Sequence, residues 1–151
     1  MTRIAALLPM RAQSERVPNK NTRQFYDRPL YHHVLQTLLS CPSIAEVCID
    51  TDSPLIMEEA GRQFSGVRLI ERPVSLRSGL TPMHEILLYD VTQVEADYYL
   101  QTHCTNPLLR AESIERAIDT FLHSSEHDSL FGVTCLQLRL WDIQGQPINH
   151  D

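Results

Sequence analysis

Five polar residues that suit phosphate binding gather in one short stretch near the start of the chain. They are Arg11, Ser14, Arg16, Lys20 and Asn21, and Lys20 is the only lysine of the sequence. Three cations, a hydroxyl and an amide can hold several phosphate oxygens, because charge-assisted hydrogen bonds are roughly twice as strong as neutral ones. A solvated surface turn is the alternative, since the proline and asparagine within the stretch are turn formers.

The charge of the chain is unevenly distributed. The net charge of the 151 residues is -6, yet residues 1–28 hold six of the thirteen basic side chains and only two acids, Glu15 and Asp27. Positive charge is therefore concentrated where an anion could bind. The net acidity argues against a general nucleic-acid binder, which would show a basic face, so a small anion is the favoured ligand. The glycines form neither GxGxxG nor GxxxxGK[ST], which excludes the dinucleotide and P-loop motifs.

Apolar runs and helical patterns alternate along the chain and must position these side chains. The run at 4–8 is continuous and is followed by Pro9, which is typical of a strand buried on both faces. Further strands are predicted at 46–50, 67–70 and 98–102, and helices at 29–39, 54–61, 81–94 and 111–122. A last strand-like apolar run covers 129–138.

This alternation predicts an α/β protein with a mostly parallel sheet flanked by helices, in one domain over 1–151. In such sheets ligands bind beyond the carboxyl ends of the strands. The basic loop, Arg72 and the segment 101–110 all follow predicted strands, so we expect them to converge on one edge. The sequence 144–147 is typical of a turn between two elements, and we expect the fold to continue past Asp151.

Several residues at the predicted strand ends have two interpretations. Asp50 and Asp52 could bind a metal as a D-x-D pair, or could be a strand-end aspartate and a helix cap. Arg72 could contact a ligand, or pair on the surface with Glu71 or another carboxylate. The same ambiguity holds for Gln101, either a ligand contact or a hydrogen-bonding rim residue.

The stretch LPMRAQSERVPNKN resembles the opening motif of the acylneuraminate (CMP-sialic acid) cytidylyltransferases, which runs approximately I-P-A-R-x-x-S-x-x-x-P-x-K-N. Further matches follow in the family's order over roughly residues 4–135. They are Thr51-Asp52, Glu71-Arg72-Pro73, Gln101-Thr102, and Asn106 to Arg110.

The resemblance implies a glycosyltransferase-A-like nucleotidyltransferase fold that is incomplete at its C-terminus. It implies an enzyme in which the anomeric hydroxyl of a sialic-acid-like sugar acid attacks the α-phosphate of CTP, with Mg²⁺ assisting, to give a CMP-sugar and pyrophosphate. A homodimer is the implied assembly of the full-length protein.

The resemblance also assigns roles by position. Arg11, Ser14 and Lys20 would hold the triphosphate, with Arg11 and Lys20 as the catalytic cations. Arg16 would add charge to the nucleotide site, Asn21 would contact the cytidine part and Arg72 would lie near the nucleotide. Gln101 and Arg110 are the substrate-binding candidates, although Arg110 could instead pair with Glu112.

Two departures from the family pattern, and the choice between its branches, leave alternatives open. Glu15 stands where many members have a lysine, and the family's metal-binding aspartate pair lies beyond the region covered, so the metal ligands are unknown. Gln101 favours the sialic-acid-like branch over the deoxyoctulosonate branch, but a related nucleotidyltransferase for another sugar acid is an alternative. A catalytically incomplete nucleotide-binding domain and an unrelated α/β binding module are two others.

The sequence does not predict a membrane protein. The apolar runs are far shorter than the roughly 20 residues needed to cross a bilayer, and no signal peptide opens the sequence, so the cytoplasm is the expected location. The four cysteines are widely spaced, and Cys48 and Cys135, within strand-like runs, are expected to be buried free thiols.

Overall fold

A four-stranded parallel sheet forms the centre of the molecule in the computed structural model, which describes residues 2–14 and 16–150. The strand order is β5-β4-β1-β6, and every neighbouring pair is parallel. The strands are β1 (Ile4–Met10), β4 (Glu46–Thr51), β5 (Val67–Glu71) and β6 (Tyr98–Gln101). The predicted mostly parallel α/β architecture is confirmed.

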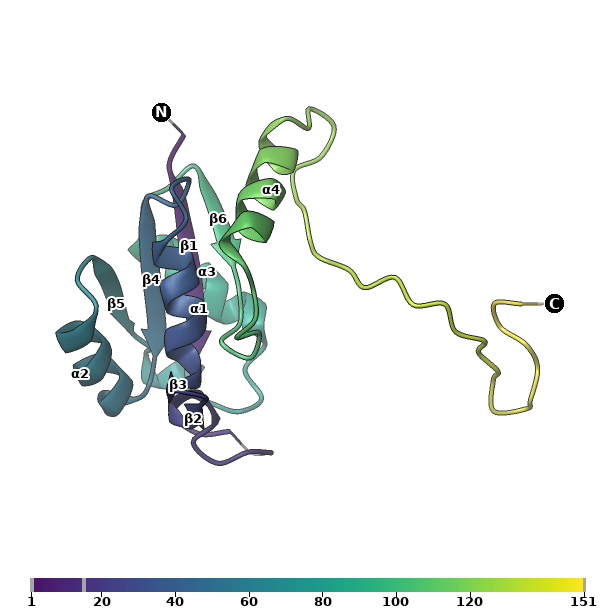
Figure 1. Ribbon diagram of the computed structural model, residues 1–151. Helices are drawn as coiled ribbons and strands as arrows, with labels where there is room; N and C mark the ends of the chain where they lie inside the picture. Colours follow the sequence, from purple (N-terminus) through teal and green to yellow (C-terminus); the bar gives the residue numbers. More distant parts are fainter. Residues whose placement is uncertain (1, 15, 151) are drawn as a thin grey trace.

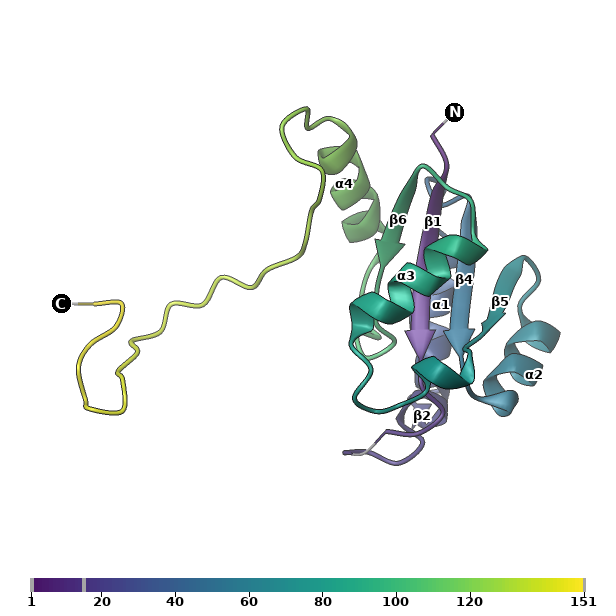
Figure 2. The same cartoon turned by 180° about the vertical axis from the view of Figure 1, so that it is seen from behind.

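Helices cover both faces of this sheet (Figure 1). On one face lie α1 (Leu30–Leu39), α2 (Pro54–Gln63) and α4 (Ala111–Leu122), while α3 (Met83–Gln93) lies alone on the other, which Figure 2 shows from behind. All seven residues of β1 are buried, as its unbroken apolar run predicts. Side chains alternate between the faces, so Ala6 and Leu8 join the core under α1 while Ala5 and Leu7 join the smaller core under α3.

Short elements at the carboxyl edge of the sheet complete the fold. A two-stranded hairpin pairs β2 (Gln24–Phe25) with β3 (Arg28–Pro29), and 3-10 turns occur at η1 (Lys20–Thr22) and η2 (Val74–Leu76). None of these is long enough to give a periodic pattern, which is why the sequence did not predict them.

The predicted strand at 129–138 is wrong. The described residues from 129 to 138 form no strand and are exposed, and the segment leads away from the sheet (Figure 1). A strand exists only when its backbone groups pair with another strand, and no described residue pairs with this run. Cys135 is consequently exposed rather than buried, whereas Cys48 is buried in β4 as expected. The predicted turn at 144–147 is present, with Gly145 at φ 77°.

Within the part of the chain that the structure describes, we find no helix with the length and apolar character that a membrane crossing requires.

Candidate functional site

A cavity of about 330 Å³ lies at the carboxyl edge of the sheet, where ligands bind in folds of this kind. Its wall contains every residue predicted to bind a nucleotide, namely Arg11, Ser14, Arg16, Lys20, Asn21 and Arg72. They come from two chain segments that are far apart in sequence but follow strands ending at the same edge. The predicted convergence of the basic loop and Arg72 is therefore confirmed.

Hydrogen bonds to the backbone hold the basic loop in place. The amide of Ala12 donates to Asp52 Oδ1 at 2.6 Å, and the Asn21 side chain donates to the carbonyl of Arg11 at 2.8 Å. Arg11 Nη1 donates to the carbonyl of Gly79 at 3.2 Å, which joins this loop to the segment before α3. The loop is thus fixed by its neighbours without an acidic partner taking the charge of Arg11 among the described residues.

Lys20 is presented by a tight turn. Asn19 adopts a left-handed conformation with φ 53°, and η1 begins at the next residue. No described residue forms an ion pair with Lys20, and its partly buried side chain lines the cavity. Glu15, the acid that departs from the family pattern, lies outside the described residues.

Asn21 is buried beside the cavity and serves first as an anchor. Its Oδ1 accepts a hydrogen bond from the thiol of Cys104 at 2.9 Å, in addition to the bond that its amide donates to Arg11. Burial raises the pKa of the Cys104 thiol to about 11, against a lowering effect of Lys20, so this thiol keeps its proton. Contact between Asn21 and a cytidine stays a prediction.

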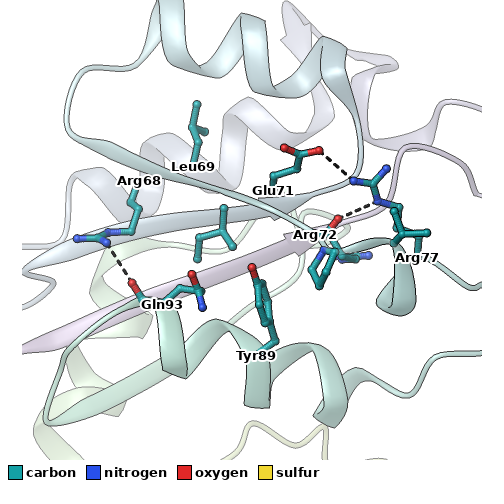
Figure 3. A pocket seen from close by; sticks show the side chains of 10 residues that line it. Arg68, Leu69, Glu71, Arg72, Arg77, Tyr89 and Gln93 are labelled. Atoms are coloured by element: carbon teal, nitrogen blue, oxygen red, sulfur yellow. Dashed lines mark hydrogen bonds and ion pairs between the residues drawn. The ribbon is translucent and has the colours of Figure 1, made fainter.

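Arg72 is fixed from three sides. Its backbone amide donates to the carbonyl of Thr51 at 3.0 Å, and its Nε donates to Asp50 Oδ1 at 2.6 Å in an ion pair that is fully buried. Arg77 donates from Nε to the Arg72 carbonyl at 2.8 Å and from Nη2 to Glu71 at 3.0 Å (Figure 3). The expected surface pairing of Arg72 with Glu71 or another carboxylate is wrong, because its partner is Asp50 in the interior, while Arg72 itself lines the cavity.

Asp52 acts as neither a helix cap nor part of a recognised metal cluster. The hydroxyl of Ser53 caps α2 by accepting from the amide of Ile56, while Asp52 accepts from the loop. No group of three His, Cys, Asp or Glu side chains able to hold a metal occurs in the described ranges. The predicted Asp52 cap is therefore wrong, and Asp50 is the strand-end residue that was expected.

Gln101 and Arg110 are absent from the residues that line this cavity. Gln101 borders a separate hollow of about 400 Å³ between β6 and α4, although its Nε2 lies 3.2 Å from a ring nitrogen of His103, which does line the cavity. Arg110 is exposed and immediately precedes α4, and it forms no ion pair with Glu112 or any other described acid.

Part of the cavity wall was not predicted from the sequence. It is formed by Ser78, Gly79, Thr81, Met83, Ile86, His103, Cys104 and Thr105. The only available signal was position, since the first of these residues precede a helix and the last three follow a strand. Asp90 lies outside the wall and is buried, and it had a clearer signal, because it is an acid within the apolar pattern of a helix.

The relatives that this chain resembles include a cytidylyltransferase and a CMP-N,N'-diacetyllegionaminic acid synthase. The chain is 28% identical over 136 residues to the 3-deoxy-manno-octulosonate cytidylyltransferase of Escherichia coli, covering 90% of the chain and 51% of that protein. It is 28% identical over 141 residues to the CMP-N,N'-diacetyllegionaminic acid synthase of Legionella pneumophila, covering 91% of the chain and 60% of that protein. The chain thus spans between half and two thirds of the length of these two relatives.

Solved structures share the fold. The structure of CMP:2-keto-3-deoxy-manno-octonic acid synthetase complexed with CTP matches with a TM-score of 0.70 and 24% identity, over 83% of this chain and 49% of that one. A 4-diphosphocytidyl-2C-methyl-D-erythritol synthase matches with a TM-score of 0.73 and 14% identity, over 99% of this chain and 69% of that one. The expected nucleotidyltransferase fold is therefore confirmed.

A family model described as cytidylyltransferase matches residues 5–143, which include every residue of the cavity wall. The chain belongs to the cytidylyltransferase family.

Proposed function

We propose that the complete protein is a CTP-dependent cytidylyltransferase that activates a sugar acid, giving a CMP-sugar and pyrophosphate. The observation that carries the proposal is the cavity at the carboxyl edge of the sheet, whose wall gathers Arg11, Arg16, Lys20 and Arg72 in a chain of net negative charge. This concentration of positive charge suits a triphosphate. Family membership supports cytidine as the base.

In this reaction the hydroxyl oxygen of the sugar forms a new bond to the α-phosphorus of CTP, and the bond to the pyrophosphate oxygen breaks. Negative charge grows on the leaving pyrophosphate, and fixed cations stabilise it without reorganising. Arg11 and Lys20 are the cations proposed for that role. Ser14 would add a hydrogen bond to a phosphate oxygen, and Asn21 would keep the loop in its binding shape while reaching the cytidine.

Magnesium is proposed as the companion of CTP, whose phosphates would supply part of its ligands. No cluster of three metal-ligating side chains occurs among the described residues. We therefore derive no step through a metal from these residues, and the metal ligands stay unassigned.

The relatives leave two candidate classes of sugar acid for this protein. One relative is named for 3-deoxy-manno-octulosonate and another for a diacetyllegionaminic acid. Gln101 and Arg110 are proposed to contact the sugar. Their position outside the nucleotide cavity supports this, because a second substrate must bind beside CTP rather than in its place.

The test is an assay of the full-length protein with CTP, Mg²⁺ and a panel containing sialic, legionaminic and deoxyoctulosonic acids. We expect equimolar CMP-sugar and pyrophosphate from one sugar, and the lack of both products from every sugar would refute the enzyme. UTP in place of CTP is the control for the base.

A second candidate function is nucleotide binding without turnover, which the acid Glu15 within the basic loop favours. Calorimetry separates the two, because CTP binding together with no product in the full-length protein would support this candidate. A homodimer and a cytoplasmic location are further proposals. Sedimentation of the full-length protein and fractionation of cells test them.

A further inference from the structure

Two carboxyl groups and one guanidinium are buried together behind the nucleotide cavity. The exposed fraction is 1% for Asp50, 1% for Arg72 and 0% for Asp90. Asp50 points to the α3 face of the sheet, because its neighbours two residues apart on β4, such as Cys48, belong to the core under α3. Asp90 belongs to α3 itself, is buried, and lies within hydrogen-bonding reach of Asp50 across this core.

Hydrogen bonding in this group is incomplete when both acids are ionised. Arg72 Nε binds Asp50 Oδ1, but Arg72 Nη1, Asp50 Oδ2 and both carboxyl oxygens of Asp90 have no partner among the described residues. Buried polar atoms are nearly always satisfied, and a buried charge without compensation is costly. Two carboxylates against one guanidinium would also leave a net buried negative charge.

One proton neutralises the group and satisfies two of the four unpartnered atoms. A protonated carboxyl is a hydrogen-bond donor, so it satisfies its own oxygen and one oxygen of the other acid, and the group becomes neutral. Burial, hydrogen bonding to Asp50 and repulsion by Asp50 raise the pKa of Asp90 to about 8, against the lowering effect of Arg72. The paired acids titrate as a unit, as coupled carboxyls do.

We propose that Asp50 and Asp90 share one proton at neutral pH and that this neutral group is a positioning device, which holds Arg72 at the wall of the nucleotide cavity. The effect on nucleotide rests on the proposed function, whereas the shared proton does not. Loss of the proton would place a buried negative charge beside the site of an anionic ligand and would weaken its binding.

Few other groups can produce the same pH dependence. The charged or titratable residues that influence Asp90 are Asp50, Arg72 and Cys48, and burial raises the pKa of Cys48 to about 12. Phosphates have a second pKa of about 6, so CTP is fully ionised above pH 7.5. In the window from pH 7.5 to 9.5 the charge of CTP is therefore constant, and comparison with Asp90→Asn assigns the remaining transition to the acid pair.

The first experiment measures CTP affinity by calorimetry across that window. We expect wild-type affinity to fall about fivefold with a midpoint near pH 8. Asp90→Asn should give a flat profile, because the amide is neutral at all pH values and still donates to Asp50. Asp119→Asn, which changes an exposed acid on α4, is the matched control and should keep the wild-type profile. A wild-type profile that is flat, or one that Asp90→Asn shares, overturns the proposal.

The second experiment needs no nucleotide. The pKa of Asp90 is raised in the folded state from an unfolded value near 3.8, so folding takes up a proton between these values. The wild-type folding constant should therefore decline by up to about tenfold per pH unit between pH 5 and pH 8 relative to Asp90→Asn, and the difference should be constant above about pH 9. Parallel curves for the two proteins would overturn the shared proton.

The two experiments separate the two hypotheses. If CTP does not bind at any pH but the unfolding curves diverge as expected, the proposed function fails and the shared proton stands. If Asp90→Asn does not fold, the wild-type affinity profile decides alone, and its flatness would refute the positioning role.

Discussion

The two sides of the cavity hold their cations in opposite ways. On the loop side, Arg11, Arg16 and Lys20 are partly or fully exposed, and hydrogen bonds involving backbone atoms keep their loop in shape. On the opposite side, Arg72 is fully buried, and its charge is balanced by an interior carboxylate. A cation in contact with water needs no partner, whereas a buried one does.

This difference teaches where binding and stability are coupled. Loop cations can change without leaving a buried charge, so their loss should affect the ligand and spare the fold. Arg72 contributes to both ligand binding and stability, because its removal leaves the buried Asp50 without its ion-pair partner.

The largest effect is expected from Arg72→Met, which keeps much of the side-chain volume but removes the charge. Leaving Asp50 without its buried partner should cost about 3–5 kcal/mol in the free energy of unfolding, measured by urea denaturation at pH 7. Arg11→Met is the matched control from the loop side and should change this free energy by less than about 0.5 kcal/mol. Equal stabilities of the two variants would contradict the claim that Arg72, unlike Arg11, stabilises the fold.

Lys20→Ala should have the opposite pattern of effects, with a large loss of CTP binding and little change in stability. We expect a loss of roughly 2–3 kcal/mol in CTP binding, because a charge-assisted contact to phosphate disappears, and a change in stability below about 0.5 kcal/mol. Calorimetry and urea denaturation measure the two quantities, with Arg62→Ala on the exposed surface of α2 as the control. A binding loss under about 0.5 kcal/mol would contradict the assignment of Lys20.

Asn21→Ala tests the anchor between the two sides. It removes the donor to the Arg11 carbonyl and the acceptor for the Cys104 thiol, so we expect a stability loss of about 1–2 kcal/mol. CTP affinity should also fall, because the loop loses its fixed shape. Unchanged thermal unfolding would show that the loop is held by its other contacts, such as the bond from Ala12 to Asp52.

The smallest effect is expected from Arg110→Ala. Arg110 is exposed and outside the nucleotide cavity, so stability should change by less than about 0.5 kcal/mol and CTP affinity by less than twofold. The KM for the sugar acid is the informative quantity, because the proposed sugar contact predicts that it rises. A loss of CTP affinity instead would extend the nucleotide site to α4.

Sequence patterns predicted most of the regular elements. The helix expected at 111–122 matches α4, and the other expected helices and the strands of the sheet differ from the observed ones by at most about two residues at either end. The apolar run at 129–138 misled, because apolar composition indicates only a capacity to pair and the described chain supplies no partner strand. The basic loop was recognisable because its residues are neighbours in sequence.

By itself the sequence determined the alternation of strands and helices, the basic loop at 11–21 and the ordered motifs of its family, since each depends on residues close together in the chain. Tertiary structure decided which side chains meet. Asp50, Arg72 and Asp90 are separated by about 20 residues each, and only the parallel pairing of β4 with β5 and the packing of α3 bring them into one buried group. The charge of that group depends on desolvation and mutual proximity, which no local pattern encodes.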